Sequence, residues 1–275
     1  MDSTFDLHIH TRFSDGHLEP EEIVKKRSEE GYTCIAITDH DGIGGSQLCF
    51  EQNLDSKYNI RIIPGIEFDS SCDLGKDMHI LGYDIDFNSE ELRNTLDEID
   101  EMRRVRNDGL LKALNNAGYD ITQEELDAIN GGRYIGKPTF AKVLNERGLI
   151  PSFEYAFKMF HDKPELKAIK KAVLSTDHVI DVIHKAGGKA VLAHPMEQLK
   201  VREGETFEEF KPRLDAILNR MLSYGIDGIE CIHPSAGERQ SKYLEEFADE
   251  HGLLKTRGSD FHFEGSTRDF KSYHR

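Results

Sequence analysis

The sequence predicts an α/β protein with a parallel sheet of seven strands, which would suit a barrel one strand short of the eightfold form. Three observations lead to this expectation. Short apolar runs alternate with helical patterns in residues 1–88 and again after residue 170. Histidine or carboxylate residues follow most of these runs, as they do where strand ends converge on an active site. The stretch 89–169 carries only helical patterns.

The first strand is expected at the start of the chain, where apolar and polar residues alternate over 5–10. A period of two places every second side chain on the same face of a strand. His8 and His10 therefore share a face, about 6.6 Å apart along the strand, and could bind one metal ion together. Asp15 follows on a polar turn and could fold back beside them. The alternative is a half-buried strand whose histidines only form hydrogen bonds.

The rest of the first part is expected to alternate between helices and strands. A helix is predicted over 20–30, because Pro20 and the acidic residues around it suit a first turn and Gly31 ends it. The apolar run 33–38 is typical of a strand buried on both faces of a parallel sheet. The remaining expected elements are a helix over 46–54 and strands over 60–67 and 77–83.

Residues 89–169 are expected to form a helical insertion domain, which caps the substrate of a barrel domain made of residues 1–88 and 170–275. A long amphipathic helix is predicted over 90–117. Thr122 fits the N-cap of a shorter helix. Two more helices are predicted over 138–147 and 152–160.

After the insertion, helices and strands alternate again. A glycine follows each of three predicted helices within two residues, as is typical of a helix end. These helices are expected over 178–185, 207–224 and 238–250, and strands are expected over 189–195, 227–233 and 253–256. The alternation predicts a parallel sheet with helical crossovers.

Composition restricts the class of protein. With 37% hydrophobic and 31% charged residues, the chain has the composition of an ordinary soluble protein. It contains no apolar run near the roughly 18 residues of a membrane helix and no signal-peptide pattern, so a cytoplasmic location without a membrane partner is expected. The net charge of −16 disfavours binding to long nucleic acid. Four scattered cysteines disfavour a disulfide framework or a zinc–thiolate site.

Nine histidine and carboxylate residues lie at or just past predicted strand ends, which a parallel barrel brings to one face. They are His8, His10, Asp15, His40, Glu67, His79, His194, Asp260 and His262. Such a set suits two or three divalent ions, and histidine with carboxylate favours manganese, iron or zinc. We therefore expect a metal-bound hydroxide to attack the phosphorus of a phosphoester. Amide hydrolysis is the chemical alternative, but no lysine that could bridge two ions lies at a strand end.

Six segments that carry these residues resemble the motifs of the PHP (polymerase and histidinol phosphatase) family, in the family's order. They are residues 6–16, 37–41, 64–67, 79–83, 193–195 and 258–262. The resemblance implies a distorted (β/α)7 TIM-like barrel with a trinuclear site. The implied ligand sets are His8, His10, Glu67 and Asp260 for one ion, Asp15, His40 and His262 for a second, and Glu67, His79 and His194 for a third.

The helical insertion resembles the branch of this family that dephosphorylates nucleotides, including AMP phosphatases, 3′,5′-nucleoside bisphosphate phosphatases and 5′-3′ oligoribonucleotide exonucleases. That branch carries a Gly-Arg-Pro-His-Ile-Ala motif thought to cap the site and contact phosphate. Residues 136–141 match it, with Lys137 in place of arginine and Thr139 in place of histidine. A lysine can still bind phosphate as a point charge, and Arg133 could supply the missing guanidinium. The alternative is that Lys137 only occupies the first turn of a surface helix.

Two further residues complete the expected substrate contacts. His233 follows the strand predicted over 227–233, where it could bind phosphate or donate a proton to the leaving oxygen. It could equally orient another ligand. Arg239 could bind phosphate.

Together these features predict a metal-dependent phosphatase acting on a small phosphorylated metabolite, with AMP or a 3′,5′-nucleoside bisphosphate as the leading substrates. A 5′-3′ exonuclease on short oligonucleotides and a histidinol-phosphate phosphatase are the alternatives. A metal-binding domain without catalytic activity is a third, which missing ligands would favour, but all nine positions are filled. The sequence does not indicate an oligomeric state.

Overall fold

The computed structural model describes residues 4–199, 202 and 204–264, and its strands form a nearly closed barrel. Seven strands follow one another around it in the order β1-β2-β3-β4-β6-β7-β8, and the two-residue strand β5 pairs with β3. Their bounds are β1 Phe5–Ile9, β2 Cys34–Ile37, β3 Arg61–Cys72, β4 Lys76–Tyr83, β5 Leu174–Ser175, β6 Lys189–Leu192, β7 Gly228–Ile232 and β8 Leu254–Arg257. The predicted α/β fold with a distorted seven-stranded barrel is confirmed.

The barrel closes where the chain after β8 returns to β1. The backbone N–H of His10 donates to the carbonyl of Phe261 at 2.9 Å, and Ile9 forms a parallel bridge with Phe261. Asp6 strengthens this seam, because its carboxylate accepts hydrogen bonds from the backbone N–H and the hydroxyl of Ser259 at 2.8 and 2.7 Å. Residues from the two ends of the barrel sequence therefore lie side by side at the site described below.

One strand departs from the expected parallel sheet. β4 runs antiparallel to both of its neighbours, β3 and β6. Only residues 73–75 connect β3 to β4, and a turn of this length permits a hairpin but no parallel crossover. β3 is also longer than predicted, so Glu67 lies within the strand and His79 lies within β4. The expectation that these two residues stand at strand ends is therefore wrong.

The helices that cover the barrel largely follow the prediction. They are α1 Pro20–Glu29, α2 Gly44–Glu51, α3 Leu54–Tyr58, α9 Thr176–Lys185, α10 Pro195–Leu199, α11 Phe207–Tyr224 and α12 Glu238–His251. The single helix expected over 46–54 is instead two helices, because Asn53 between them adopts a left-handed conformation with φ 51°. Asparagine tolerates that region better than most residues.

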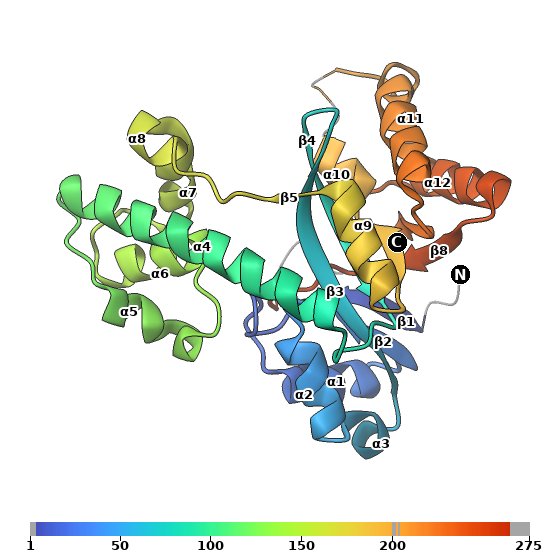
Figure 1. Cartoon of the computed structure of the whole chain (residues 1–275), viewed down its shortest axis with the longest axis horizontal. Coiled ribbons are helices and arrows are strands. Elements are labelled where there is room, and N and C mark those ends of the chain that lie inside the picture. The colour runs from blue at the N-terminus through green and yellow to red at the C-terminus, as the bar shows by residue number, and fades with distance from the viewer. Residues whose placement is uncertain (1–3, 200–201, 203, 265–275) are drawn as a thin grey trace.

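Helices fill the chain between β4 and β5 and gather on one side of the molecule (Figure 1). They are α4 Glu90–Asn116, α5 Gln123–Asp127, the 3₁₀ helix η1 Ile129–Gly132, α6 Lys137–Glu146, α7 Phe153–Asp162 and α8 Pro164–Lys167. Thr122 caps α5 as predicted. We call residues 90–167 the helical segment. No helix in the described part of the chain is long and apolar enough to cross a membrane.

The helical segment has its own apolar cluster and is tied to the barrel by α4. Leu110 and Leu114 of α4 pack in the cluster of the helical segment, whereas Leu92 and Ile99 pack with the barrel. α4 therefore spans both cores. Its N-terminal half, which carries Leu92 and Ile99, lies against the strands in Figure 1. The division into two domains stays a prediction.

Candidate metal centre

His8 of β1 is held in one orientation by a buried glutamate. Its Nδ1 lies 3.1 Å from Glu230 Oε1, and both side chains are fully buried. Because a carboxylate only accepts hydrogen bonds, Nδ1 carries the hydrogen and Nε2 carries the lone pair. That Nε2 faces Glu67 Oε2 at 3.3 Å and Asp260 Oδ1 at 3.6 Å. A lone pair facing two carboxylates is stable only if a proton or a metal ion lies between them.

Glu67 stands at the middle of the cluster. Five imidazoles lie within 3.3 Å of its carboxylate, those of His8, His10, His40, His79 and His194. Its side chain is fully buried, and burial alone would raise the pKa of Glu67. The surrounding histidines outweigh burial and hold that pKa well below its ordinary value. Glu67 therefore faces the cluster as a carboxylate with both oxygens available to bridge cations.

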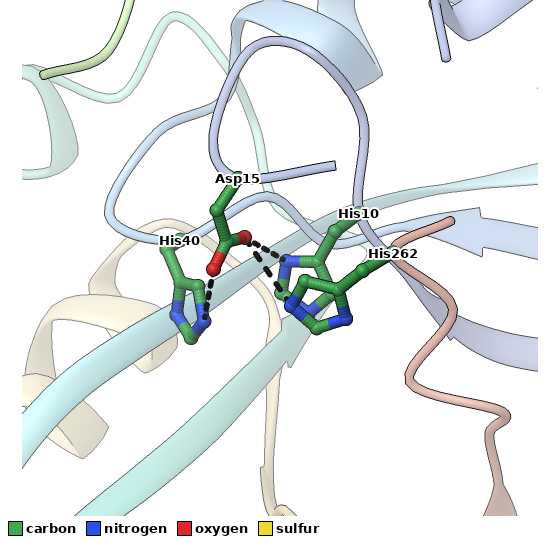
Figure 2. A group of neighbouring side chains, drawn as sticks. All are labelled: His10, Asp15, His40 and His262. Carbon is green, nitrogen blue, oxygen red and sulfur yellow. Dashed lines mark ion pairs between the residues drawn. The ribbon is translucent and has the colours of Figure 1, made fainter. Parts of the chain in front are cut away.

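A second group lies beside it and is formed by loops that follow β1, β2 and β8 (Figure 2). Asp15 Oδ1 lies 3.3 Å from His262 Nε2 and 3.6 Å from His10 Nδ1, and Asp15 Oδ2 lies 4.0 Å from His40 Nε2. Nδ1 of His262 is 2.8 Å from the carbonyl of Asp260, an acceptor, so Nε2 carries the lone pair. Nε2 of His262 therefore faces the carboxylate of Asp15 and not a hydrogen-bond donor.

Two candidate ligands have a positive φ, which few residues other than glycine adopt. His194 follows β6 with φ 22°, and Asp260 follows β8 with φ 51°. Each such residue costs on the order of 1–3 kcal/mol and persists only where the surroundings impose it. The backbone N–H of His194 is fixed by Glu230 Oε2 at 2.8 Å. The barrel therefore maintains strain at the points where these two side chains enter the cluster.

The donor set fits divalent ions. Several buried atoms that could ligate a metal have no hydrogen-bond partner among the described residues. They are Nε2 of His8 and His10, Nδ1 of His40 and His194, Oδ1 of Asp15 and Oε2 of Glu67. Imidazole nitrogens and carboxylate oxygens within 4.8 Å of one another form five groups among the described residues. Four of them together contain all nine predicted residues, and the fifth joins Asp260 to Glu197 and His233. The structure brings these nine residues together, and their assignment to individual ions stays a prediction.

Sequence reasoning missed Asp69 and Glu230. Asp69 lies two residues after Glu67 in β3, and its Oδ1 lies 3.4 Å from His40 Nδ1 and 3.5 Å from His79 Nε2. The period of two along a strand would have found it, had β3 been expected to continue past residue 67. Glu230 is a single carboxylate inside an apolar strand, which was itself a signal of a buried functional role.

Asp39, just after β2, supports the loop that carries Asp15. Its carboxylate accepts from the backbone N–H and the hydroxyl of Thr11, both at 2.7 Å, and from the Ser14 hydroxyl at 2.6 Å. Burial raises the pKa of Asp39 above its ordinary value, although these hydrogen bonds oppose the shift. Ser14 Oγ in turn lies 3.4 Å from His10 Nδ1.

Two of the predicted substrate contacts, Lys137 and Thr139, lie in the first turn of α6. Thr139 lines a cavity that also borders Asp15. Lys137 is half-buried at the start of α6, and burial, with the nearby cations Arg106 and Lys170, lowers its pKa. The residue is therefore not an ordinary solvated lysine of a surface helix.

The two predicted arginine contacts are engaged elsewhere. Arg133 pairs with Glu19 at 2.9 Å and lies over the ring of Phe13. Arg239 is exposed, pairs with Glu208 and lies over the ring of Phe207. Neither of these carboxylates belongs to the cluster. The geometry gives Arg239 no contact with the nine residues.

Comparisons with known proteins agree with this arrangement. The family described as PHP domain matches residues 6–253. The 5′-3′ exoribonuclease Rnm of Salmonella typhimurium is 28% identical over 258 residues, which cover 94% of this chain and 85% of the relative. A 3′,5′-nucleoside bisphosphate phosphatase of Chromobacterium violaceum is 28% identical over 268 residues, which cover 96% and 88%. The solved structure of a candidate metal-dependent phosphoesterase from Bifidobacterium adolescentis, 27% identical, matches with a TM-score of 0.79 and covers 95% and 88%.

Proposed function

Because the chain belongs to the PHP family of phosphoester hydrolases, we propose that it removes phosphate from nucleotides at the metal centre around Glu67. The observation that carries this proposal is the set of buried imidazole nitrogens and carboxylate oxygens, on His8, His10, Asp15 and their neighbours, that lie close to one another without hydrogen-bond partners among the described residues. A nucleotide phosphatase among the relatives supports the choice of substrate.

The nine predicted ligands would hold two or three divalent ions, and Asp69 is a tenth candidate. Such ions, when bound, neutralise phosphoryl charge and lower the pKa of a coordinated water. The protein's own contribution is to fix the imidazoles in the ligand tautomer. Glu230 does so for His8, and the Asp260 carbonyl does so for His262.

His233 has the opposite tautomer, and we assign it the role of proton donor to the leaving oxygen. Its Nδ1 accepts a hydrogen bond from the backbone N–H of Ser235 at 3.0 Å, so the proton of the neutral ring sits on Nε2. That Nε2 is buried, has no hydrogen-bond partner among the described residues and lies 3.6 Å from Asp260 Oδ2. The N–H of such a ring points inward and can donate to the leaving oxygen. Nε2 would have to lose this hydrogen before His233 could join Glu197 and Asp260 around an ion.

Cations of the helical segment favour an anionic substrate. Arg106 of α4 is buried, and its Nε has no hydrogen-bond partner among the described residues. Burial lowers the pKa of Lys137, and the nearby charges of Arg106 and of Lys170, just past the helical segment, lower it further. Arg106 and Lys137 form no ion pair with any described carboxylate. The carboxylate of Asp69, a candidate ligand, acts on the charge of Arg106, so a phosphate bound at the metal centre would come near this cation.

Phosphate release tests the proposal. Purified protein, loaded with Mn²⁺, Fe²⁺ or Zn²⁺, should release phosphate from AMP or from a 3′,5′-nucleoside bisphosphate faster than from histidinol phosphate. His10→Ala should abolish release from every substrate, because the imidazole of His10 faces Glu67 and Asp260 at 3.2 Å. His161→Ala, which alters an exposed histidine of α7, is the matched control. Absence of release from all substrates by metal-loaded wild type would refute the proposal.

Trimming of short oligonucleotides is the second candidate, because an exoribonuclease is among the relatives. The same metal-loaded protein would then release mononucleotides from the 5′ end of a di- to tetranucleotide. Comparing that rate with phosphate release from AMP separates a nuclease from a phosphatase. A strong preference for the oligonucleotide would replace the first candidate by the second.

A further inference from the structure

A cavity of about 530 Å³ opens beside the second group of candidate ligands. Asp15 and His262 form part of its wall, together with aromatic residues that include Phe153 and Phe157 of α7 and Phe263 from the loop after β8. The cavity is therefore bounded by the barrel on one side and by the helical segment on the other. Its size is within the roughly 300–1,000 Å³ of small-molecule sites.

The aromatic rings on this cavity are not packed into the core. Phe153, Phe157 and Phe263 are 37%, 40% and 41% exposed. Phe153 and Phe157 pack edge to face at 5.3 Å, and Phe263 stacks on the ring of His17 at 4.9 Å. These contacts hold the rings in place and leave apolar surface open to a ligand. Each side of the cavity, helical and barrel, contributes one such pair.

We propose that this cavity binds the base of a nucleotide whose phosphate lies at the metal centre. This inference rests on the proposed function and adds how the substrate is recognised. A planar base stacks on aromatic rings, and such stacking is sequence-tolerant because every base has a π-face. Lys142 lines the same cavity and can meet the polar edge of a base. Thr139 also lines it, but its hydroxyl accepts from the backbone N–H of Gly136 at 3.1 Å and donates to the carbonyl of Tyr134 at 3.4 Å. An imidazole such as that of histidinol phosphate would leave most of this volume empty.

Comparing a nucleotide with its base-free counterpart tests the proposal. Phe157→Ala should lower the ratio of kcat/KM for AMP to kcat/KM for ribose 5-phosphate about tenfold, mainly through a higher KM for AMP. Phe153→Ala should shift the ratio in the same direction. Tyr155→Ala is the matched control, because Tyr155 lies on the same helix and is 41% exposed but does not line the cavity. Thermal melting confirms that each variant folds.

Equal losses on AMP and ribose 5-phosphate in Phe157→Ala, or an equal shift of the ratio in Tyr155→Ala, would overturn the base site. A binding measurement separates this outcome from failure of the proposed function. Adenosine carries no phosphate, so calorimetry should detect its binding to wild type and a loss of at least about fivefold in affinity in Phe157→Ala. Inactive wild type that binds adenosine would refute the phosphatase alone. Active wild type without such binding would refute the base site alone.

Discussion

His8 and Glu230 form a buried pair although they are 222 positions apart in sequence, with Nδ1 of His8 3.1 Å from Glu230 Oε1. The same carboxylate accepts the backbone N–H of His194 at 2.8 Å. One residue thus orients two candidate ligands that enter the site from different strands. Burial alone would lower the pKa of His8. The negative charges of Glu67, Glu230 and Asp260 outweigh burial and hold that pKa well above its ordinary value.

We expect Glu230→Gln to reduce metal affinity and phosphatase activity about 10–100-fold, the usual effect of removing a partner that orients a metal ligand. Glutamine is neutral and presents an amide group that no longer requires Nδ1 of His8 to carry the hydrogen. Elemental analysis after dialysis, together with kcat, measures the change. Glu250→Gln, at an exposed position of α12, should leave both unchanged. Full metal content in Glu230→Gln would contradict the orienting role.

Arg103→Met should lower the free energy of unfolding by about 2 kcal/mol, because it breaks a buried ion pair between α4 and the barrel but leaves Asp41 with its second cation, Lys171. Nη2 of Arg103 lies 3.0 Å from Asp41 Oδ2, and Lys171 reaches the same carboxylate. Urea denaturation measures the loss. Arg104→Met is the control on the next residue of α4, where the guanidinium is exposed, and it should change the free energy of unfolding little. Equal losses would show that the Asp41 contact does not stabilise docking of α4.

Stability should depend on pH through Asp227, which precedes β7. Burial would raise the pKa of Asp227, but hydrogen bonds from Lys189, the backbone N–H of Ala190 and His184 outweigh it and lower the pKa. The carboxylate therefore stabilises the fold fully above its unfolded pKa of about 3.9, and this contribution is lost as the pH falls through the lower folded value.

Asp227→Asn should accordingly lower the free energy of unfolding by about 1 kcal/mol at pH 7, and the difference from wild type should shrink below about pH 4. Urea denaturation of metal-free protein at several pH values measures it without interference from metal loss. Asp181→Asn, which alters an exposed pair with Lys185, should change stability little at any pH. A difference that grows toward acid pH would mean that the sign of the shift is wrong.

His233→Ala should lower kcat for AMP about 100-fold or more and affect p-nitrophenyl phosphate much less. Nitrophenolate leaves without a proton, whereas the ribose oxygen of AMP needs one. The ratio of the two losses is the measurement, because a purely structural role would slow both substrates equally. Unchanged metal content in the variant would also separate proton donation from metal ligation.

Most residues of the candidate site could be predicted from the sequence. They follow predicted strands, and a barrel brings the ends of its strands together. His40, His194 and His262 could be placed in this way. Glu67 and His79 were identified for the wrong reason: they lie inside a hairpin, where antiparallel pairing sets Asp69 opposite His79. That hairpin depends on how the chain turns over three residues, and the parallel alternative could not be dismissed from apolar patterns alone.

The cavity could not have been predicted from the sequence. Phe153 and Phe157 have the spacing of a buried helix face, and pattern alone assigns such residues to a core. Ala156, Met159 and Phe160 of α7 face the core instead. Phe153 and Phe157 line a cavity shared with loops more than a hundred residues away in sequence. The same holds for Arg103 and Asp41, whose pairing joins α4 to the loop after β2.

The seam between β1 and the chain after β8 has a consequence for synthesis. His8, His10, Asp15, His40, Glu67 and His79 all leave the ribosome within the first 79 residues. Asp260 and His262 follow some 180 residues later, and Asp6 cannot bind Ser259 before then. Because chains are synthesised from the N-terminus, the nascent protein exposes an incomplete chelating surface for most of its elongation. Under the proposed ligand assignment, firm metal retention requires residues from both ends of the chain and would therefore report completed folding.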